Sequence, residues 1–379
     1  MSPSTPLLRG VNLTEIESLA LSSQLNMADG HARQELTKSQ RSIVDELPDL
    51  FAKAAAQPVD DLEREAHRAY LHLLHQHSYP TRPGGVLTCY SSSVAMEILA
   101  RSLVPAGGGP VALVHPTFDN IPDLLRGNGL RLLPVEEDVL HEGSVSAAVP
   151  EGVRCLFITT PNNPTGRVLA EQRLAAIAAE CAARDVVLAL DTSFRGFDTR
   201  SHYDHYAVLR DSGCRWVVIE DTGKLWATLD LKVGLLASSD HVGLPLAKIH
   251  SDILLGVSPF VLVLVTRFAE DAAAGGLADL HRFIADNRAL VRATLADVPD
   301  LAFPDGDARV SVERVDLGER RCLNVWTRLR QSGIYVLPCS QFHWADPARG
   351  DHSLRIALAR VPGALEAAVR ALRAVLLSP

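Results

Sequence analysis

Three polar segments, each directly after an apolar run, carry residues whose types suit covalent chemistry. The segments are 160–166 (Thr-Pro-Asn-Asn-Pro-Thr-Gly), 191–194 (Asp-Thr-Ser-Phe) and 221–224 (Asp-Thr-Gly-Lys). The amine of a lysine such as Lys224 is a nucleophile that forms Schiff bases with carbonyl compounds. A second cation, Lys232, follows eight residues later. The pattern therefore predicts that Lys224 holds an aldehyde cofactor and that Lys232 binds the phosphate of that cofactor.

Together, and in this order, the three segments resemble the pyridoxal-phosphate (PLP) site of the fold-type-I aminotransferase superfamily. The resemblance implies that Asp191 pairs with the pyridinium nitrogen, which keeps the ring able to accept electrons from the substrate's α-carbon. It also implies that Asn163 donates to the phenolic oxygen of the ring and contacts the substrate. Two alternatives stay open, because Asn-Asn-Pro-Thr-Gly is also a good turn sequence and lysine is usually a surface residue.

A serine cluster is the expected phosphate site. Ser91, Ser92 and Ser93 open the helical stretch 94–103, and hydroxyls with free amides at a helix N-terminus bind anions. The alternative is a simple N-cap. By resemblance, Ser193 and Lys232 complete the phosphate site. Two further positions match the superfamily: Phe118 would stack on the ring, and Arg355 would grip the substrate α-carboxylate with its planar fork.

The elements that must position these residues follow from the hydrophobic pattern. Between residues 90 and 240, short β-branched runs alternate with helical stretches, which is typical of a largely parallel sheet with ligands beyond its carboxyl ends. With the resemblance, this predicts an α/β fold-type-I protein with a mainly parallel seven-stranded sheet and a small C-terminal α/β domain. We expect an N-terminal arm (1–45) that is part of the active site and small domain, a large PLP-binding domain (46–275) and a small domain (276–379).

Bulk properties limit the alternatives. A net charge of −8 argues against a nucleic-acid surface, and the apolar stretch 259–265 is too short to span a bilayer. The six cysteines form no CxxC pair, which favours reduced, buried thiols. The histidines at 67, 72, 75 and 77 lack a spacing that demands a metal. No export signal is apparent in residues 1–20, so we expect a cytoplasmic protein without membrane or nucleic-acid partners.

Two positions depart from the aminotransferase pattern. Aminotransferases commonly have a serine three residues before the lysine and an arginine eight residues after it, where this chain has Asp221 and Lys232. A carboxylate at position 221 cannot donate to a phosphate and would repel it. Asp221 is therefore predicted to face a cation, and the obvious candidate is a basic side chain of the substrate.

Further segments narrow the resemblance. Those that carry it are 12–17, 26–33, 89–93, 115–120, 191–198, 220–226 and 341–344. With these, the chain resembles the PLP-dependent L-arginine hydroxylases and oxidases of actinomycete antibiotic pathways, such as enduracididine-type non-ribosomal-peptide biosynthesis. The resemblance implies that Thr14, Glu17 and Asp221 face the guanidinium and that His31 places a reacting water. Otherwise Glu17 would be a solvated helix residue and His31 a loop histidine.

The expected reaction follows from that resemblance. A homodimer would use PLP and dioxygen, without metal or flavin, to oxidise free L-arginine, with Lys224 moving the protons. Products would be 4-hydroxy-2-ketoarginine, with 2-ketoarginine as by-product, ammonia and hydrogen peroxide. The alternatives are an oxidase that makes a 4,5-dehydro arginine and an ordinary aminotransferase for arginine or other basic amino acids. A PLP-binding transcription regulator is disfavoured, because only about 45 non-basic residues precede the large domain.

Overall fold

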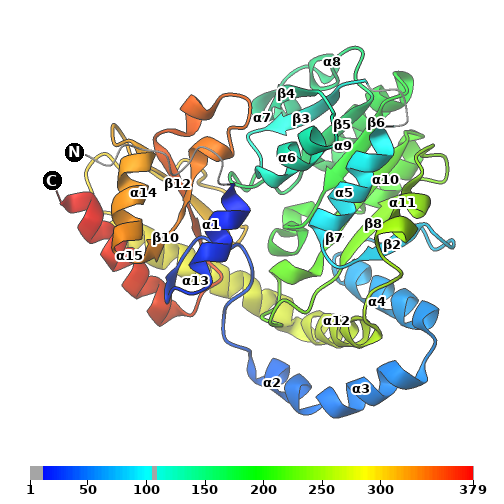
Figure 1. Cartoon of the computed structure of the whole chain (residues 1–379), viewed down its shortest axis with the longest axis horizontal. Coiled ribbons are helices and arrows are strands. Elements are labelled where there is room, and N and C mark those ends of the chain that lie inside the picture. Colours follow the sequence, from blue (N-terminus) through cyan, green and yellow to red (C-terminus); the bar gives the residue numbers. More distant parts are fainter. Residues whose placement is uncertain (1–11, 105–108, 379) are drawn as a thin grey trace.

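The computed structural model of the chain describes residues 12–104 and 109–378 (Figure 1). Its largest element is a seven-stranded sheet, with strands in the order β2 (Val86–Cys89), β8 (Gly234–Ser238), β7 (Trp216–Asp221), β6 (Val187–Asp191), β5 (Cys155–Thr159), β3 (Val111–His115) and β4 (Leu132–Glu136). The five strands from β7 to β4 are parallel, whereas β8 is antiparallel to both β7 and β2. The predicted mainly parallel seven-stranded sheet is confirmed.

Burial explains why these runs form central strands. Every residue of β3, β5, β6, β7 and β8 is buried, as expected for strands covered on both faces. Three groups of helices pack around the sheet. In the first, α5 (Ser92–Leu103) contacts α6 (Asn120–Gly127) and α11 (Leu246–Ile253); in the second, α9 (Glu171–Ala183) contacts α8 (Val145–Ala148) and α10 (His205–Ser212). In the third, α12 (Pro259–Asp271) contacts α3 (Leu47–Ala56) and α4 (Val59–Leu73). The short helix α7 (Glu137–His141) follows β4 directly.

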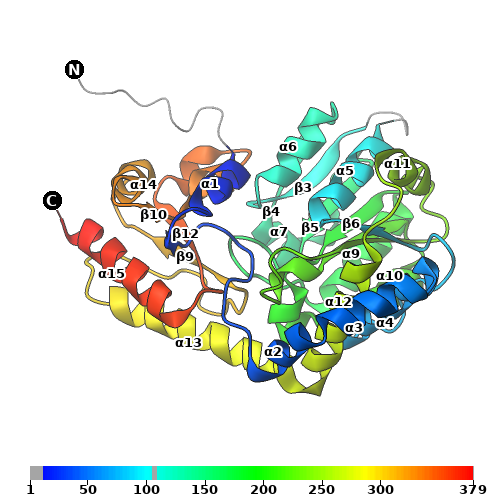
Figure 2. The ribbon, with the colours of Figure 1, turned by 60° about the horizontal axis from the view of Figure 1, so that its bottom comes forward.

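A second unit follows the long helix α13 (Leu277–Leu295), which leaves α12 through a π-helical turn at Ala272–Gly276. Gly275 in that turn has φ 123, a conformation that side chains rarely adopt. The unit contains a three-stranded antiparallel sheet, β11 (Leu337–Pro338), β12 (Ser353–Ala357) and β9 (Val312–Asp316), with α14 (Cys322–Gln331) and α15 (Pro362–Leu377). Helices α13 and α15 lie side by side (Figure 2). This is the small α/β unit that the sequence predicts.

The N-terminal segment joins the two units. Helix α1 (Leu13–Ala20) packs on the C-terminal unit, and β1 (Leu25–Asn26) pairs in parallel with β10 (Ile334–Tyr335). Helix α2 (Lys38–Asp45) instead packs on α12, beside the large sheet unit. We therefore use "the arm" for residues 12–36, which lie between the units. Among the described residues no helix is long and apolar enough to cross a membrane, and all six cysteines are buried and unpaired.

Candidate active site

A cavity of about 240 Å³ lies beyond the carboxyl ends of β5, β6 and β7. Nearly all the predicted site residues line it, although they come from the arm and from five parts of the large unit; they are Thr14, Glu17, His31, Ser91, Ser92, Ser93, Phe118, Asn163, Asp191, Ser193, Asp221, Lys224 and Lys232. Arg355 of β12 borders the same space. A side chain on Gly30 would come within 3.8 Å of Lys224 Nζ and 3.9 Å of Arg355 Nη1. The backbone of the arm at Gly30 therefore lies close to both Lys224 and Arg355.

Lys224 and Asp191 occupy the ends of neighbouring strands. Asp191 is the last residue of β6, and Lys224 ends the single 3-10 turn, Thr222–Lys224, that follows β7. Burial raises the pKa of Asp191 to about 6. The hydroxyl of Ser193 donates to Asp191 Oδ1 at 2.6 Å. In this structure Ser193 therefore binds the Asp191 carboxylate. Lys224 Nζ lies 5.9 Å from the centroid of the Phe194 ring.

Asn163 is held from behind by its neighbour. The amide nitrogen of Asn162 donates to Pro116 O at 2.9 Å and to Glu137 Oε1 at 2.8 Å. Asn162 in turn accepts a hydrogen bond from Asn163 N. Asn163 Oδ1 is buried and has no hydrogen-bond partner among the described residues. Because buried polar atoms are normally paired, its orientation suits a polar ligand group in the cavity.

Asp221 lies at the N-terminus of α5. Its carboxylate accepts hydrogen bonds from Ser92 Oγ at 2.7 Å, Ser92 N at 3.3 Å and Gly223 N at 2.7 Å. Burial alone would raise the pKa of Asp221, but the charges of Lys224 and Lys232 lower it. The cations that Asp221 faces in this structure are thus two lysines, and it lies beside the serines predicted to bind phosphate.

The arm brings a carboxylate onto Arg355. Glu17 Oε1 accepts from Arg355 Nη2 at 2.9 Å and from Gly30 N at 3.2 Å. Arg355 is fully buried, and its Nε and Nη1 have no hydrogen-bond partner among the described residues. Burying a guanidinium with two unpaired N–H donors costs free energy unless a ligand supplies hydrogen-bond acceptors for them. Arg355 is therefore suited to receive a carboxylate of a ligand.

His31 connects the arm to the phosphate-site lysine. Its Nδ1 lies 2.6 Å from Asp29 Oδ1, and its Nε2 lies 2.6 Å from Lys232 Nζ. Burial would raise the pKa of Asp29, but the hydrogen bond and charge of His31, together with Arg360, lower it. Burial lowers the pKa of Lys232. With Asp29 ionised, Nδ1 carries the ring hydrogen, which leaves Nε2 as the acceptor for the lysine.

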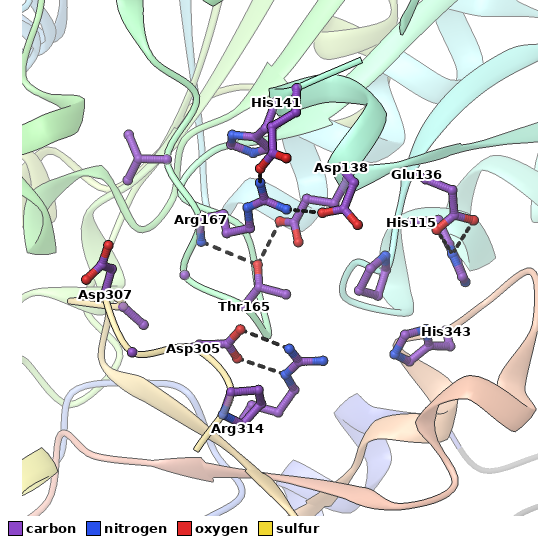
Figure 3. A pocket seen from close by; sticks show the side chains of 18 of the residues that line it. His115, Glu136, Asp138, His141, Thr165, Arg167, Asp305, Asp307, Arg314 and His343 are labelled. Atoms are coloured by element: carbon purple, nitrogen blue, oxygen red, sulfur yellow. Dashed lines mark hydrogen bonds and ion pairs between the residues drawn. The ribbon is translucent and has the colours of Figure 1, made fainter. Parts of the chain in front are cut away.

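A larger cavity of about 640 Å³ lies elsewhere between the two units (Figure 3). Its arginines are already paired with carboxylates, as Asp305 and Arg314 are through two hydrogen bonds of 2.8 and 2.9 Å. Arg349 likewise bonds Glu136 at 2.6 Å. No lysine among the described residues lines this space. It therefore lacks the lysine amines that the smaller cavity provides.

The smaller cavity has the donor set that PLP requires. It combines an amine at a strand end, a buried carboxylate on the next strand, an unpaired amide oxygen and a cluster of serines with a lysine at a helix N-terminus. The sequence prediction omitted Thr159, Asn120 and Met96, which also line the cavity. Asn120 belongs to a segment already singled out, 115–120, but nothing in its residue type marks it as a cavity residue.

The comparison with known families agrees with this fold. The family model for aminotransferase class I and II matches residues 27–372. The chain belongs to this family and is a PLP-dependent enzyme of the aminotransferase fold.

One solved structure is much more similar in sequence to this chain than the other relatives described below. The structure of MppP soaked with the product 2-ketoarginine has 61% sequence identity and a TM-score of 0.92, and the match covers 93% of this chain and all of that one.

Other relatives are more distant. Histidinol-phosphate aminotransferase of Methanococcoides burtonii is 24% identical, over 65% of this chain and 64% of the relative, which is less than two thirds of the relative's length. Valine–pyruvate aminotransferase of Mycobacterium tuberculosis is 25% identical, over 78% and 76%. Aspartate aminotransferase from Thermus thermophilus shares the fold, with 15% identity, a TM-score of 0.78 and coverage of 99% and 100%.

Proposed function

We propose that the protein oxidises free L-arginine with dioxygen, using PLP, to 4-hydroxy-2-ketoarginine, with 2-ketoarginine as by-product and release of ammonia and hydrogen peroxide. The observation that carries the proposal is the pairing of Glu17 with Arg355 at the edge of the cavity that holds Lys224. A carboxylate and a guanidinium there match the two charged ends of arginine. The similarity to MppP, whose structure was soaked with the product 2-ketoarginine, supports L-arginine as the substrate, since its oxidation gives that keto acid.

The cofactor roles proposed for these residues follow from their chemistry. When bound, PLP joins the substrate amine through its aldehyde carbon and accepts the electrons left at the α-carbon. Lys224 is the base that removes the α-proton and then a proton further along the side chain. Asp191 holds a proton on the ring nitrogen, Asn163 donates its amide N–H to the phenolic oxygen, and the Phe118 ring stacks on the pyridine.

The phosphate of the cofactor would bind where hydroxyls and a cation converge. Ser91 caps α5, with its hydroxyl accepting from Val94 N at 3.3 Å, and Ser92 and Ser93 begin the helix. Free amides at this end favour an anion. Lys232 contributes the positive charge, and Ser193 completes the set.

Substrate binding requires an exchange of partners. The α-carboxylate of arginine takes the place of Glu17 on Arg355, and Glu17 turns to the incoming guanidinium together with Thr14 and Asp221. His31 then orients the water that supplies the new hydroxyl group. Its fixed tautomer leaves Nε2 as an acceptor, which can take a proton from that water once Lys232 binds phosphate instead.

We also propose that the active protein is a homodimer and that dioxygen receives the electrons without a metal or flavin. Apolar side chains exposed near the cavity favour a second copy: Leu229 is 87% exposed, three residues before Lys232, and Tyr90 is 51% exposed, next to Ser91. Exposed apolar residues gathered around a site are typical of an interface. Sedimentation of a fully active monomer would refute the dimer.

An oxygen electrode tests the proposed reaction. L-arginine alone should cause oxygen uptake with release of ammonia and peroxide. Each 2-ketoarginine requires one dioxygen, and each 4-hydroxy-2-ketoarginine requires two, so the ratio of oxygen to ammonia reports the product. Mass spectrometry separates the hydroxylated product from a 4,5-dehydro product. No oxygen uptake, with rapid conversion when pyruvate or 2-oxoglutarate is added, would leave the aminotransferase that the family match also supports.

A further inference from the structure

Asp119 makes an unusual contact with the arm. It is the residue before α6, the N-cap position, where an aspartate side chain normally bonds the amides of its own helix. Here it makes no such cap. Instead Asp119 Oδ2 accepts a hydrogen bond of 2.7 Å from the backbone N–H of Leu13, the first residue of α1, which is 106 residues away in sequence. The Asp119 side chain thus binds the backbone at the start of α1.

The contact is costly for the carboxylate. Asp119 is 6% exposed, its Oδ1 has no hydrogen-bond partner among the described residues, and burial raises its pKa to about 7. The neighbouring charges, Asp123 and Glu17, are also acidic. What favours the carboxylate is the backbone amides of Leu13 and Asn120, which lie at the N-termini of α1 and α6. A buried, poorly compensated carboxylate is retained more often for position or function than for stability.

The geometry links this contact to the active site. Helix α1 packs its apolar residues on the C-terminal unit, whereas Asp119 belongs to the large sheet unit and follows Phe118 of the cavity wall. Thr14 and Glu17 are three residues apart on α1, so they share one helix face, and both line the cavity. The hydrogen bond between Leu13 and Asp119, at the start of α1, therefore fixes the position of Thr14 and Glu17 along the cavity wall.

We infer that Asp119 is a positioning residue that holds α1 against the large unit, so that Thr14 and Glu17 face the substrate. This inference rests on the proposed substrate roles of Thr14 and Glu17. Asp119 touches neither cofactor nor substrate in the proposal; it acts through the backbone of Leu13.

Hydrogen exchange of residues 13–20 tests the inference directly. The PLP-loaded enzyme would be measured with and without L-arginine, as wild type, Asp119→Ala, Asp119→Asn and Asp123→Asn. Asp119→Ala should speed exchange of α1 by about tenfold or more in the arginine-bound enzyme, since a hydrogen bond to a charged group is lost. Asp119→Asn keeps an oxygen acceptor and should recover part of the protection. Asp123→Asn removes a neighbouring negative charge that raises the pKa of Asp119, so it should leave α1 exchange unchanged or slow it.

Kinetics give the second readout. Asp119→Ala should raise KM for L-arginine about tenfold with a smaller change in kcat, while PLP absorbance and exchange of α5 and α6 stay as in the wild type. Unchanged α1 exchange in Asp119→Ala, or an equal effect of Asp123→Asn, would overturn the inference. If wild type does not oxidise arginine, the proposed function fails, but the exchange result still decides whether Asp119 holds α1.

Discussion

Replacing Glu17 by glutamine should change which substrates the enzyme prefers. In the structure Glu17 Oε1 is bonded to Arg355 Nη2 at 2.9 Å and to Gly30 N at 3.2 Å, and Arg355 is fully buried with two unused donors. We propose that Glu17 leaves Arg355 and binds the substrate guanidinium. Glutamine has nearly the same shape but no charge. The substitution therefore removes the electrostatic part of both interactions.

The magnitude follows from those two interactions. Loss of one hydrogen bond between charged groups costs about 1.5–3 kcal/mol, which is roughly 10- to 150-fold in the affinity for L-arginine. L-citrulline has the same length but a neutral end group, so it gains nothing from the charge of Glu17. For citrulline, Glu17 is only a competitor for Arg355. The affinity of the enzyme for L-citrulline should stay constant or rise in Glu17→Gln, because Glu17 then no longer competes with the α-carboxylate for Arg355.

The assay is a titration of the PLP-loaded enzyme with each amino acid, followed by the absorbance of the bound cofactor. Glu15→Gln is a matched control, since it removes a charge from the same helix. Glutamine also preserves the capping box, in which Glu15 accepts from Asn12 N at 2.8 Å. The control should bind both ligands as wild type does. An equal loss of arginine and citrulline affinity in Glu17→Gln would refute the proposed exchange of partners.

Four further predictions concern the cofactor and the reaction. Lys224→Ala should lose the absorbance of lysine-bound PLP after dialysis; borohydride reduction that still links PLP to a different lysine would show the assignment to be wrong. Asp221→Ser should weaken L-arginine binding by about 1.5–3 kcal/mol, measured by the same titration, and unchanged affinity would remove Asp221 from the guanidinium site. Burial raises the pKa of Asp191 to about 6, so the folded protein favours the protonated form of this residue. The stability that this proton contributes is fully present below the pKa that Asp191 has in the unfolded chain, and it is lost as the pH rises through about 6. Asp191→Asn should therefore stabilise the cofactor-free protein by up to about 3 kcal/mol at pH 8 and little at pH 4, as denaturant unfolding at the two values would measure. His31→Ala should shift the product toward 2-ketoarginine while oxygen uptake largely persists, and an unchanged product ratio by mass spectrometry would exclude His31 from water placement.

The part of the site on the large unit was predictable because parallel strands end at one edge. Asn163, Asp191 and Lys224 each follow a separate apolar run, and the runs become the adjacent strands β5, β6 and β7. Side chains just past those ends must then converge. The alternation of strands and helices indicated a largely parallel sheet, and the resemblance to the fold-type-I superfamily completed the fold class. No contact between distant segments was needed for that inference.

Contacts of the arm could not be derived from local pattern. The pair Glu17–Arg355 spans 338 residues and the pair Leu13–Asp119 spans 106. Both depend on how α1 docks between the units, which hydrophobic periodicity does not specify. Helix α2, which lies within the predicted arm (1–45), packs on α12 beside the large sheet unit. The short strand β2, antiparallel at the sheet edge, was missed because four residues give too little alternation.

Specificity for arginine follows from the need to keep buried charges paired. Glu17 and Arg355 are bonded to each other in this structure. A substrate with a carboxylate at one end and a cation at the other can replace each partner, so neither buried group loses its counter-charge. An amino acid with an apolar side chain would satisfy Arg355 but leave Glu17 without a cation, and a partly buried carboxylate that has lost its partner is costly. A cation without a carboxylate would leave the fully buried Arg355 uncompensated, which costs about 3–5 kcal/mol. The Glu17–Arg355 pair therefore selects against both classes of molecule. Only a molecule that carries both charges at the right separation gives each of these two residues a new counter-charge.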